Sequence, residues 1–369
     1  MTSGGDSSLL RRYNQAAVLR ALHTSAAAGL TLTELVRATE VARATVENAL
    51  AGLVAQNLAA EVVPDANAPR QVGRPAKRYR FHAAAARVLG LDVGVHKVLA
   101  VVADLSGTVL GVRRTAVSPE LSPEHRIAAA RALGHRALRG AGEGPLRAVG
   151  VGTTGIVGAD HTVTISSQLP GWAGTDLAAV FQEGLGAPVV AGNDSKLAAL
   201  GERWRGSART MRDVVYVHVG RRISTGIVLG GTVLHGTHGA AGEIGRLPGS
   251  GWHGAHERLL ARWGTPEALF AAVRAHDTSA VTALDTFTAD LVQGIAPVVL
   301  TVDPEAVVIG GGLSRAGDLL FDPLRARLSE VCLFPVAVVG SELGDEAVAH
   351  GAVRLALDTV EERLFGVVD

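Results

Sequence analysis

The clearest pointer to the architecture is residues 88–115, VLGLDVGVHKVLAVVADLSGTVLGVRRT. This stretch contains three apolar, β-branched runs, at 88–94, 98–104 and 109–115, separated by short turns that contain glycine. Such runs predict three strands that follow one another as a meander. The alanine-rich segment 123–139 comes next and predicts a long helix, so the unit is of the α/β type.

The same pattern recurs in the second half of the chain. Residues 214–220, 223–229 and 232–234 predict another meander, and Gly231–Leu234 repeats the letters of Gly107–Leu110. The repetition indicates an internal duplication that produced two similar α/β lobes with a cleft between them. Small-molecule sites are commonly found in such clefts.

The first 82 residues follow a different pattern. Apolar residues at helical spacing predict helices over 9–22 and 42–58, with a middle helix that begins at Thr31. Thr31 and Glu34 have the spacing of a capping box, in which each side chain bonds the other residue's backbone N–H. A strand over 71–81 completes a winged helix-turn-helix pattern, although a helical bundle with a solvated hairpin is the alternative.

The distribution of charge favours DNA binding by this segment. The whole chain is neutral, with 35 basic and 35 acidic residues, but residues 1–82 carry ten Arg or Lys and only six acids. Phosphate contacts depend on clustered cations. The side chains expected to contact DNA lie on the first turns of the third helix and on the wing: Arg43, Thr45, Asn48, Arg74, Lys77 and Arg78.

Composition excludes several classes of protein. With 47% hydrophobic and 19% charged residues, the chain is typical of a folded globular protein. No apolar run reaches the roughly 18 residues of a membrane span, and the polar start is neither a signal nor a transit peptide, so we expect a cytoplasmic protein without membrane contact. The single cysteine, Cys332, excludes an internal disulfide and a cysteine-based metal site. Metal binding is also disfavoured for the two histidine pairs, because glycine interrupts each of them: His235 with His238, and His253 with His256.

Polar residues border the expected cleft at two points. A buried strand runs into the adjacent Asn193 and Asp194, while a small-residue loop delivers Glu243 and a later segment delivers Glu257. Carboxylates and an amide offer acceptors and donors for the vicinal hydroxyls of a sugar, and Trp172 is a candidate platform for its ring. The alternative is that Asn193 or Asp194 serves only as a helix N-cap.

Three glycine-containing turns are candidates for holding a phosphate or a planar group. The turns 94–97 and 220–226 carry bulky side chains where a phosphate cradle needs bare backbone N–H groups. Arg221 and Arg222 either bind an anion themselves or lie in a solvated turn. The turn 309–314 either packs against a base or sugar, or forms a tight strand-to-helix connection.

Several segments, taken together, resemble the ROK family, which groups bacterial sugar kinases with sugar-responsive transcriptional regulators. The similarity extends over nearly the whole chain. The segments that carry it are Tyr13–Gln15, Gly73–Tyr79, Gly90–Gly94, Leu169–Trp172, Asn193–Asp194, Ala198–Glu202, Gly242–Gly245 and Gly310–Ser314. The resemblance implies an α/β fold class, with an N-terminal winged helix-turn-helix and two actin-like, ribonuclease-H-like α/β lobes.

The resemblance also implies a domain order and a set of site residues. The winged helix-turn-helix would cover 1–82, the first lobe 83–193 together with a C-terminal helix over 346–369, and the second lobe 194–345. The sugar-contacting positions that it implies are Asn193, Asp194, Glu243 and Glu257. Asp194 stands where the family's kinases keep their general base.

The departures from the family pattern favour a regulator over a kinase. The first phosphate loop of the kinases, Gly-Gly-Thr-Lys, is replaced by Gly94–Lys97, and their second loop, Gly-Thr-Gly-Ile-Gly, by Gly220–Ser224. Because phosphoryl transfer depends on positioning and neutralising a triphosphate, we expect little turnover and no cofactor. The family's zinc element is lost as well, with Arg246 in place of its histidine, so Arg246 either donates to a sugar or favours a phosphorylated ligand.

These observations predict a DNA-binding regulator rather than an enzyme. Its cleft would sense a sugar or sugar phosphate, and it would bind a double-stranded operator as a homodimer or higher homo-oligomer. Two alternatives come from other classes: an ATP-dependent sugar kinase with an attached winged helix, and a scaffold whose cleft binds no small molecule.

Overall fold

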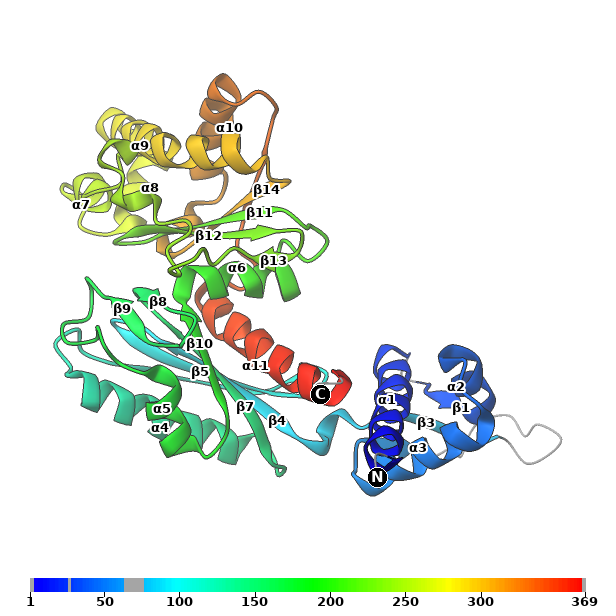
Figure 1. The fold of residues 1–369 in the computed structure, drawn as a ribbon. Helices are drawn as coiled ribbons and strands as arrows, with labels where there is room; N and C mark the ends of the chain where they lie inside the picture. The colour runs from blue at the N-terminus through cyan, green and yellow to red at the C-terminus, as the bar shows by residue number, and fades with distance from the viewer. Residues whose placement is uncertain (1–2, 26–27, 63–75, 367–369) are drawn as a thin grey trace.

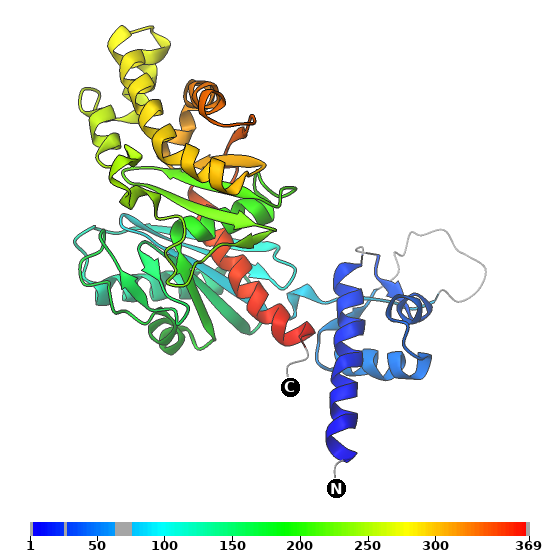
Figure 2. The same ribbon diagram turned by 45° about the horizontal axis from the view of Figure 1, so that its top comes forward.

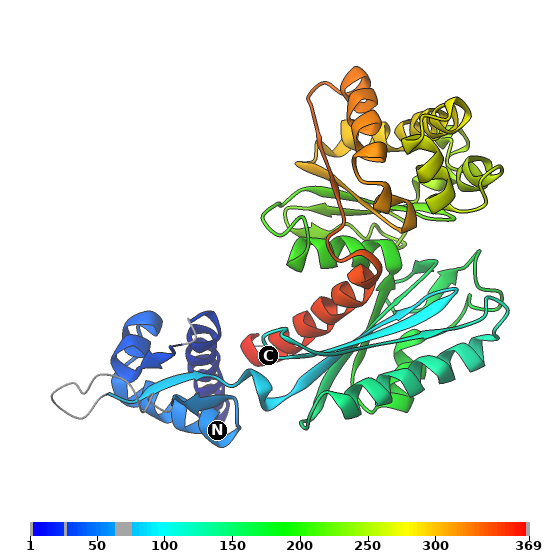
Figure 3. The ribbon, with the colours of Figure 1, turned by 180° about the vertical axis from the view of Figure 1, so that it is seen from behind.

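The computed structural model describes residues 3–25, 28–62 and 76–366, and it divides into an N-terminal head and two α/β lobes (Figure 1). The two lobes are stacked, and the head lies to one side of them. The last helix, α11 (Ala347–Phe365), runs from the junction of the lobes to the head, as the rotated views also show (Figures 2 and 3).

The head contains the three predicted helices, α1 (Ser3–Thr24), α2 (Leu32–Thr39) and α3 (Arg43–Ala55). The capping box at the start of α2 is confirmed, because Thr31 Oγ1 accepts from the Glu34 amide at 3.2 Å and Glu34 Oε2 accepts from the Thr31 amide at 2.7 Å. The third helix ends earlier than predicted. Asn57 adopts a left-handed backbone (φ 61°) and turns the chain, so Leu58 is buried from a turn rather than from the helix.

The wing is a small antiparallel sheet in which β3 (Arg78–Phe81) lies between β1 (Leu30–Thr31) and β2 (Ala59–Glu61). The strand predicted over 71–81 is thus present only from Arg78 among the described residues. Residues 63–75, which include the predicted DNA contact Arg74, lie outside the described residues.

The first lobe is built on a five-stranded sheet of order β10-β7-β4-β5-β6. Its strands are β4 (Arg87–Val93), β5 (Lys97–Asp104), β6 (Val109–Ala116), β7 (Leu146–Thr153) and β10 (Val189–Asn193). Helices α4 (Pro123–Gly140) and α5 (Leu177–Leu185) cover one face, and α11 packs on the other against β4 and β7. A short hairpin, β8 (Ile156–Val157) with β9 (Val163–Ile165), follows β7.

The second lobe repeats this plan with a five-stranded sheet of order β13-β12-β11-β14-β15. Its strands are β11 (Val214–Val219), β12 (Ile223–Leu229), β13 (Thr232–Val233), β14 (Ala306–Gly310) and β15 (Ala337–Gly340). In both sheets an antiparallel meander is continued by two parallel strands, as the internal repeat predicts.

Helices cover both faces of the second sheet. The outer layer consists of α7 (Ala255–Leu260), α8 (Pro266–Arg274), α9 (Thr278–Val302) and α10 (Asp318–Val331). By length and composition α9 could span a membrane, but just over half of its apolar window is buried against the lobe. The opposite face packs on α6 (Asp194–Arg205).

The lobes meet where α6 crosses α11. The two helices approach so closely that a Cβ added to Gly351 would lie 1.8 Å from the Leu197 carbonyl oxygen, and one on Gly201 would lie 2.4 Å from that of Ala347. Only glycine fits such backbone contacts. The crossing therefore joins the lobes at a point adjacent to the start of α6, where Asn193 and Asp194 lie.

Candidate functional site

A cavity of about 300 Å³ lies between the lobes and contains all five residues predicted to bind a ligand. Both lobes contribute to its walls. The first lobe supplies Thr154, Gly155, Ser167 and Gln168, the β10–α6 junction supplies Asn193 and Asp194, and the second lobe supplies Arg221, Arg222, Ile223, Ser224, Gly242, Glu243, Gly245, Arg246, Trp252, His253, Gly254 and Glu257.

The Asn193 side chain is engaged within the protein. Its Oδ1 caps α6 by accepting from the Lys196 amide at 3.1 Å, and its Nδ2 donates to the Gly155 carbonyl at 3.0 Å and to Asp194 Oδ1 at 2.9 Å. The helix-cap alternative is therefore present in the structure. The sugar-contacting role of Asn193 stays a prediction, and its structural effect is to fix the adjacent carboxylate.

Hydrogen bonds hold the Asp194 carboxyl group in place, while its surroundings disfavour the ionised form. Its Oδ1 also accepts from the Ser195 amide at 2.7 Å. Burial, reinforced by the nearby Glu243 carboxylate, raises the pKa of Asp194 to about 6, although the bonds from Ser195 and Asn193 act in the opposite direction. A carboxyl group with such a pKa can exchange a proton near neutral pH.

Glu243 and Glu257 are free to accept from a ligand, since neither carboxylate has a hydrogen bond or ion pair with another described residue. Burial raises the pKa of Glu243, against the opposing effect of Lys196 and Arg246. Glu243 precedes a short 3-10 helix, Ile244–Arg246, which also presents Arg246.

The prediction that Trp172 forms a platform for a sugar ring is wrong. Its side chain is fully buried in the core of the first lobe, where Nε1 donates to Thr153 Oγ1 at 3.0 Å. Trp252 lines the cavity instead, with its own Nε1 bonded to the Leu291 carbonyl at 3.2 Å. Sequence reasoning missed Trp252, and its position between the predicted Glu243 and Glu257 was the signal that could have found it.

The turn 94–97, which the resemblance places where the kinases have their first phosphate loop, is held by the protein's own contacts. The buried Arg126 guanidinium donates to the carbonyls of Gly94 at 2.6 Å and Val95 at 3.0 Å, which fixes the turn. Lys97 Nζ donates to the Asp345 carbonyl at 2.8 Å and lies 3.9 Å from the buried Asp92 carboxylate. The Lys97 ammonium group is therefore engaged by groups of the protein itself.

The glycines of the turn 309–314 have a packing role. A Cβ on Gly310 would lie 2.0 Å from Tyr216 Oη, and one on Gly311 would lie 2.6 Å from the Val219 carbonyl oxygen. Gly311 also has a positive φ of 85°. These contacts support the tight strand-to-helix connection over a surface for a base or sugar.

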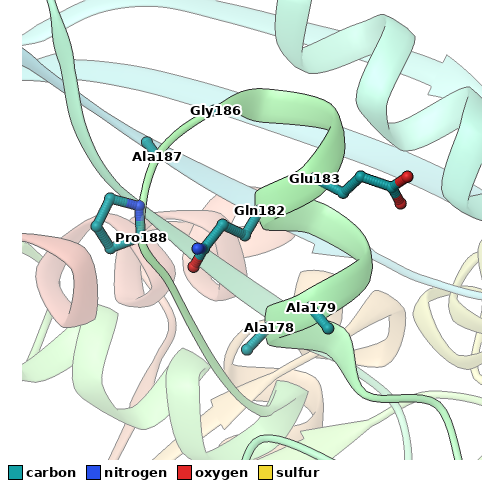
Figure 4. Close-up of a pocket in the computed structure, with 7 residues that line it drawn as sticks. All are labelled: Ala178, Ala179, Gln182, Glu183, Gly186, Ala187 and Pro188. Carbon is teal, nitrogen blue, oxygen red and sulfur yellow. The ribbon is translucent and has the colours of Figure 1, made fainter.

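A second hollow lies on the first lobe between α5 and the start of β10 (Figure 4). Alanine, glycine and proline make up most of its lining, and Figure 4 shows Glu183 pointing away from it. Without converging polar groups it offers little chemistry to a ligand, so the cavity between the lobes is the candidate site.

The predicted DNA-contacting residues lie in two places on the head. Arg43 and Asn48 are exposed on α3 and Thr45 is half-buried, while the Arg43 guanidinium pairs with Glu47 at 3.2 Å. On the wing, Lys77 pairs with Glu61 at 2.8 Å.

Arg78 has structural partners. Its Nη2 donates to the Gly29 carbonyl at 3.0 Å and lies 3.0 Å from Glu34 Oε2, so it ties the wing to the start of α2. The roles of these residues in DNA binding stay predictions.

A model described as the ROK family matches residues 88–254 and 261–359, which is more than half of the chain. The chain therefore belongs to the ROK family.

Relatives of two kinds are similar to this chain. The xylose repressor of Bacillus spizizenii is 21% identical over 96% of this chain and 97% of its own length. The glucokinase of Streptomyces coelicolor is 28% identical over 73% of this chain and 96% of its own length. A solved ROK family transcriptional regulator, described as a homologue of the E. coli MLC protein, superposes with a TM-score of 0.74 at 20% identity and covers 97% of this chain and 98% of its own. The similarity to the repressor and the regulator thus includes the head.

Proposed function

We propose that this ROK family member is a DNA-binding transcriptional regulator that senses a sugar or sugar derivative in the cavity between its lobes and has lost kinase activity. The observation that carries the proposal is the state of the turns that would hold a nucleotide. Lys97 is engaged with Asp345, Arg126 fixes Gly94 and Val95, and Arg222 bonds Ser167 across the lobes.

The head supports the DNA-binding part of the proposal. Its α3 follows α2 through a short turn and presents exposed polar side chains, including Asn48, on its first turns. These are the positions that reach base edges in the major groove in helix-turn-helix proteins. Heads of this kind bind an operator in pairs, one on each half-site, so the proposal includes a homodimer. It also includes a cytoplasmic location, where the DNA lies.

The lobes support the sensing part. Because both lobes line the cavity, a ligand that contacts both walls favours one arrangement of the lobes over another, and this difference in affinity is what shifts a conformational equilibrium. The head is attached to the helix that crosses the junction of the lobes. Arg20 Nη2 donates to the Phe365 carbonyl at the end of α11, at 2.9 Å.

The proposal is tested by gel retardation with DNA from upstream of the chain's own gene, at fixed salt because phosphate contacts make binding salt-dependent. Specific retardation that a sugar or a phosphorylated sugar from a panel changes is the expected result. Absence of specific retardation, with and without those ligands, would contradict it.

Replacing Asn48 with alanine should weaken operator binding by about 10- to 100-fold, because an amide that pairs with a base is worth about 1–3 kcal/mol of discrimination. Fluorescence anisotropy with labelled operator measures the loss. The matched control is Gln56→Ala, an exposed amide at the end of the same helix. Equal effects of the two substitutions would remove α3 from the proposed recognition surface.

An ATP-dependent sugar kinase is the second candidate, and it is favoured by the retained Asp194 with its raised pKa. An ADP-release assay with ATP, Mg²⁺ and a panel of hexoses separates the two functions. We expect no turnover above background, whereas a rate in the usual enzyme range of about 1–1000 per second would favour the kinase.

A further inference from the structure

We propose that the sensed ligand is an anionic sugar, whose phosphate or carboxylate is bound by Arg221, Arg222 and Arg246 while its hydroxyls face the carboxylates of the same cavity. This inference deepens the proposed function and rests on it. The shared chemistry is a sugar ring that carries an anionic group.

The three arginines come from two neighbouring segments of the second lobe. Arg221 and Arg222 form the turn between β11 and β12, and Arg246 ends the 3-10 helix that follows Glu243. The segments are in contact, because a Cβ on Gly245 would lie 3.2 Å from the Ile223 carbonyl oxygen. All three residues line the cavity, and all three are exposed rather than packed into a core.

The guanidinium groups form no close ion pair within the described part of the chain, although the charge of Arg246 opposes the rise in the pKa of Glu243. None of the three lies within 4.0 Å of a carboxylate there, although Glu243 and Glu257 line the same cavity. Arg258, one residue beyond Glu257, behaves differently and pairs with Asp290 at 2.7 Å. Arginine is the residue best suited to bind phosphate or carboxylate through paired hydrogen bonds, and unpaired arginines in a cavity keep that capacity available.

One arginine is already positioned across the cleft. Arg222 Nη1 donates to Ser167 Oγ of the first lobe at 3.2 Å. An anion bound to Arg222 would thus lie at the boundary between the lobes, where it can favour their closed arrangement. The remaining donors of the guanidinium are available to the ligand.

Two carboxylates of the same cavity are unsuited to an anion but suited to hydroxyls. Asp194 and Glu243 repel one another, and burial adds to the cost of their charges. A ligand hydroxyl can donate to such a carboxylate, whereas a phosphate beside it would be repelled. The charge pattern therefore orients the ligand, with its anionic group on the arginines and its ring toward Asp194 and Glu243.

The test compares matched neutral and anionic probes by titration calorimetry on the full chain. The probes are glucose, galactose, mannose, xylose and N-acetylglucosamine, their phosphate esters, glucuronate, and inorganic phosphate. We expect at least one phosphate ester or sugar acid to bind about 100-fold more tightly than its neutral parent. The two kinds of anionic probe distinguish phosphate from carboxylate.

Variants then assign the contact. Arg222→Gln and Arg246→Gln should each weaken binding of that anionic probe by about tenfold or more, because each loses charge-assisted hydrogen bonds. Binding of the neutral parent should change less. The control is Arg274→Gln, an exposed arginine on α8 away from the cavity. Thermal unfolding of each variant checks that it is folded.

Four outcomes would overturn the inference: a neutral sugar that binds as tightly as its anionic form, unchanged affinity in the arginine variants, equal affinity for inorganic phosphate alone, or binding of no probe. Operator retardation is measured on the same samples. Retained operator binding that a neutral sugar controls would overturn this inference but support the proposed regulator, whereas loss of specific operator binding would contradict the regulator itself.

Discussion

Asp92 shows how a single buried charge limits stability. The carboxylate lies on β4 with little exposure, and burial raises its pKa to about 7, with Asp194 and Asp345 adding to the shift and Lys97 opposing it. The folded protein therefore holds a proton that the unfolded chain releases near pH 3.8, the ordinary value. Stability must fall as pH rises between those two values, because the unfolded state binds fewer protons there.

Asp92→Asn removes this penalty. We expect the stability advantage of the variant over the parent to grow as pH rises from about 4 to about 7, and to be about 1–3 kcal/mol larger at about pH 8 than at about pH 5. Thermal unfolding at the two pH values measures the difference. Glu330→Gln, an exposed acid on α10, is the control and should show no such dependence. A difference between Asp92→Asn and the parent that does not change with pH would contradict the assignment.

The sequence predicted which residues form the site, but it did not predict how their side chains are oriented and bonded. Asn193, Asp194 and Glu243 are brought into one cavity as expected, because each follows a strand end or a small-residue loop that borders the cleft. The position of Trp172 was predicted wrongly because a sequence does not say which way an indole points. In the structure the indole lies in the core and bonds Thr153. The hydrogen bonds that the Asn193 side chain forms within the protein could not be predicted from the sequence either.

At the level of elements, the start of α2 can be tested directly. Thr31→Ala removes the side chain that accepts from the Glu34 amide at 3.2 Å and donates to Glu34 Oε2 at 2.9 Å, while the bond from the Thr31 backbone amide to Glu34 remains. A lost N-cap costs about 0.5–2 kcal/mol, so the head should unfold at a lower temperature. Thermal unfolding followed by circular dichroism measures the shift. Thr33→Ala, on the exposed side of the same helix, should be neutral or slightly stabilising.

Elements with strong local signals were predicted almost to the residue. Strands β4, β5, β11 and β12 begin and end within a residue or so of the predicted runs, since β-branched residues between glycine turns have few alternatives. The two-residue β1 was missed because its pairing with β3 is decided by tertiary contact. The close crossing at Gly201 and Gly351 was missed for the same reason: each glycine sits inside a helix, where sequence predicts only a small destabilisation.

The whole molecule joins the head to the lobes through a continuous core. One hydrophobic cluster extends from Leu19 and Leu53 in the head to Val88 and Val360 in the first lobe. At its edge the His23 ring packs against Phe81, with centroids 4.9 Å apart, and against Phe365 at 5.2 Å. Because α11 also crosses α6 between the lobes, packed elements connect the head to the junction of the lobes.

Phe365→Ala tests that connection. Removing the half-buried ring should cost about 1–2 kcal/mol, less than the 3–5 kcal/mol of a fully buried phenylalanine. For a head of this size each kcal/mol lowers the unfolding temperature by about 4–8 °C. Scanning calorimetry should therefore show one transition in the parent protein and an earlier, separate transition of the head in the variant. Leu10→Ala, an equally apolar truncation at an exposed position of α1, is the control. If the variant and the control both unfold in one transition at the parent's temperature, the ring does not couple the head to α11.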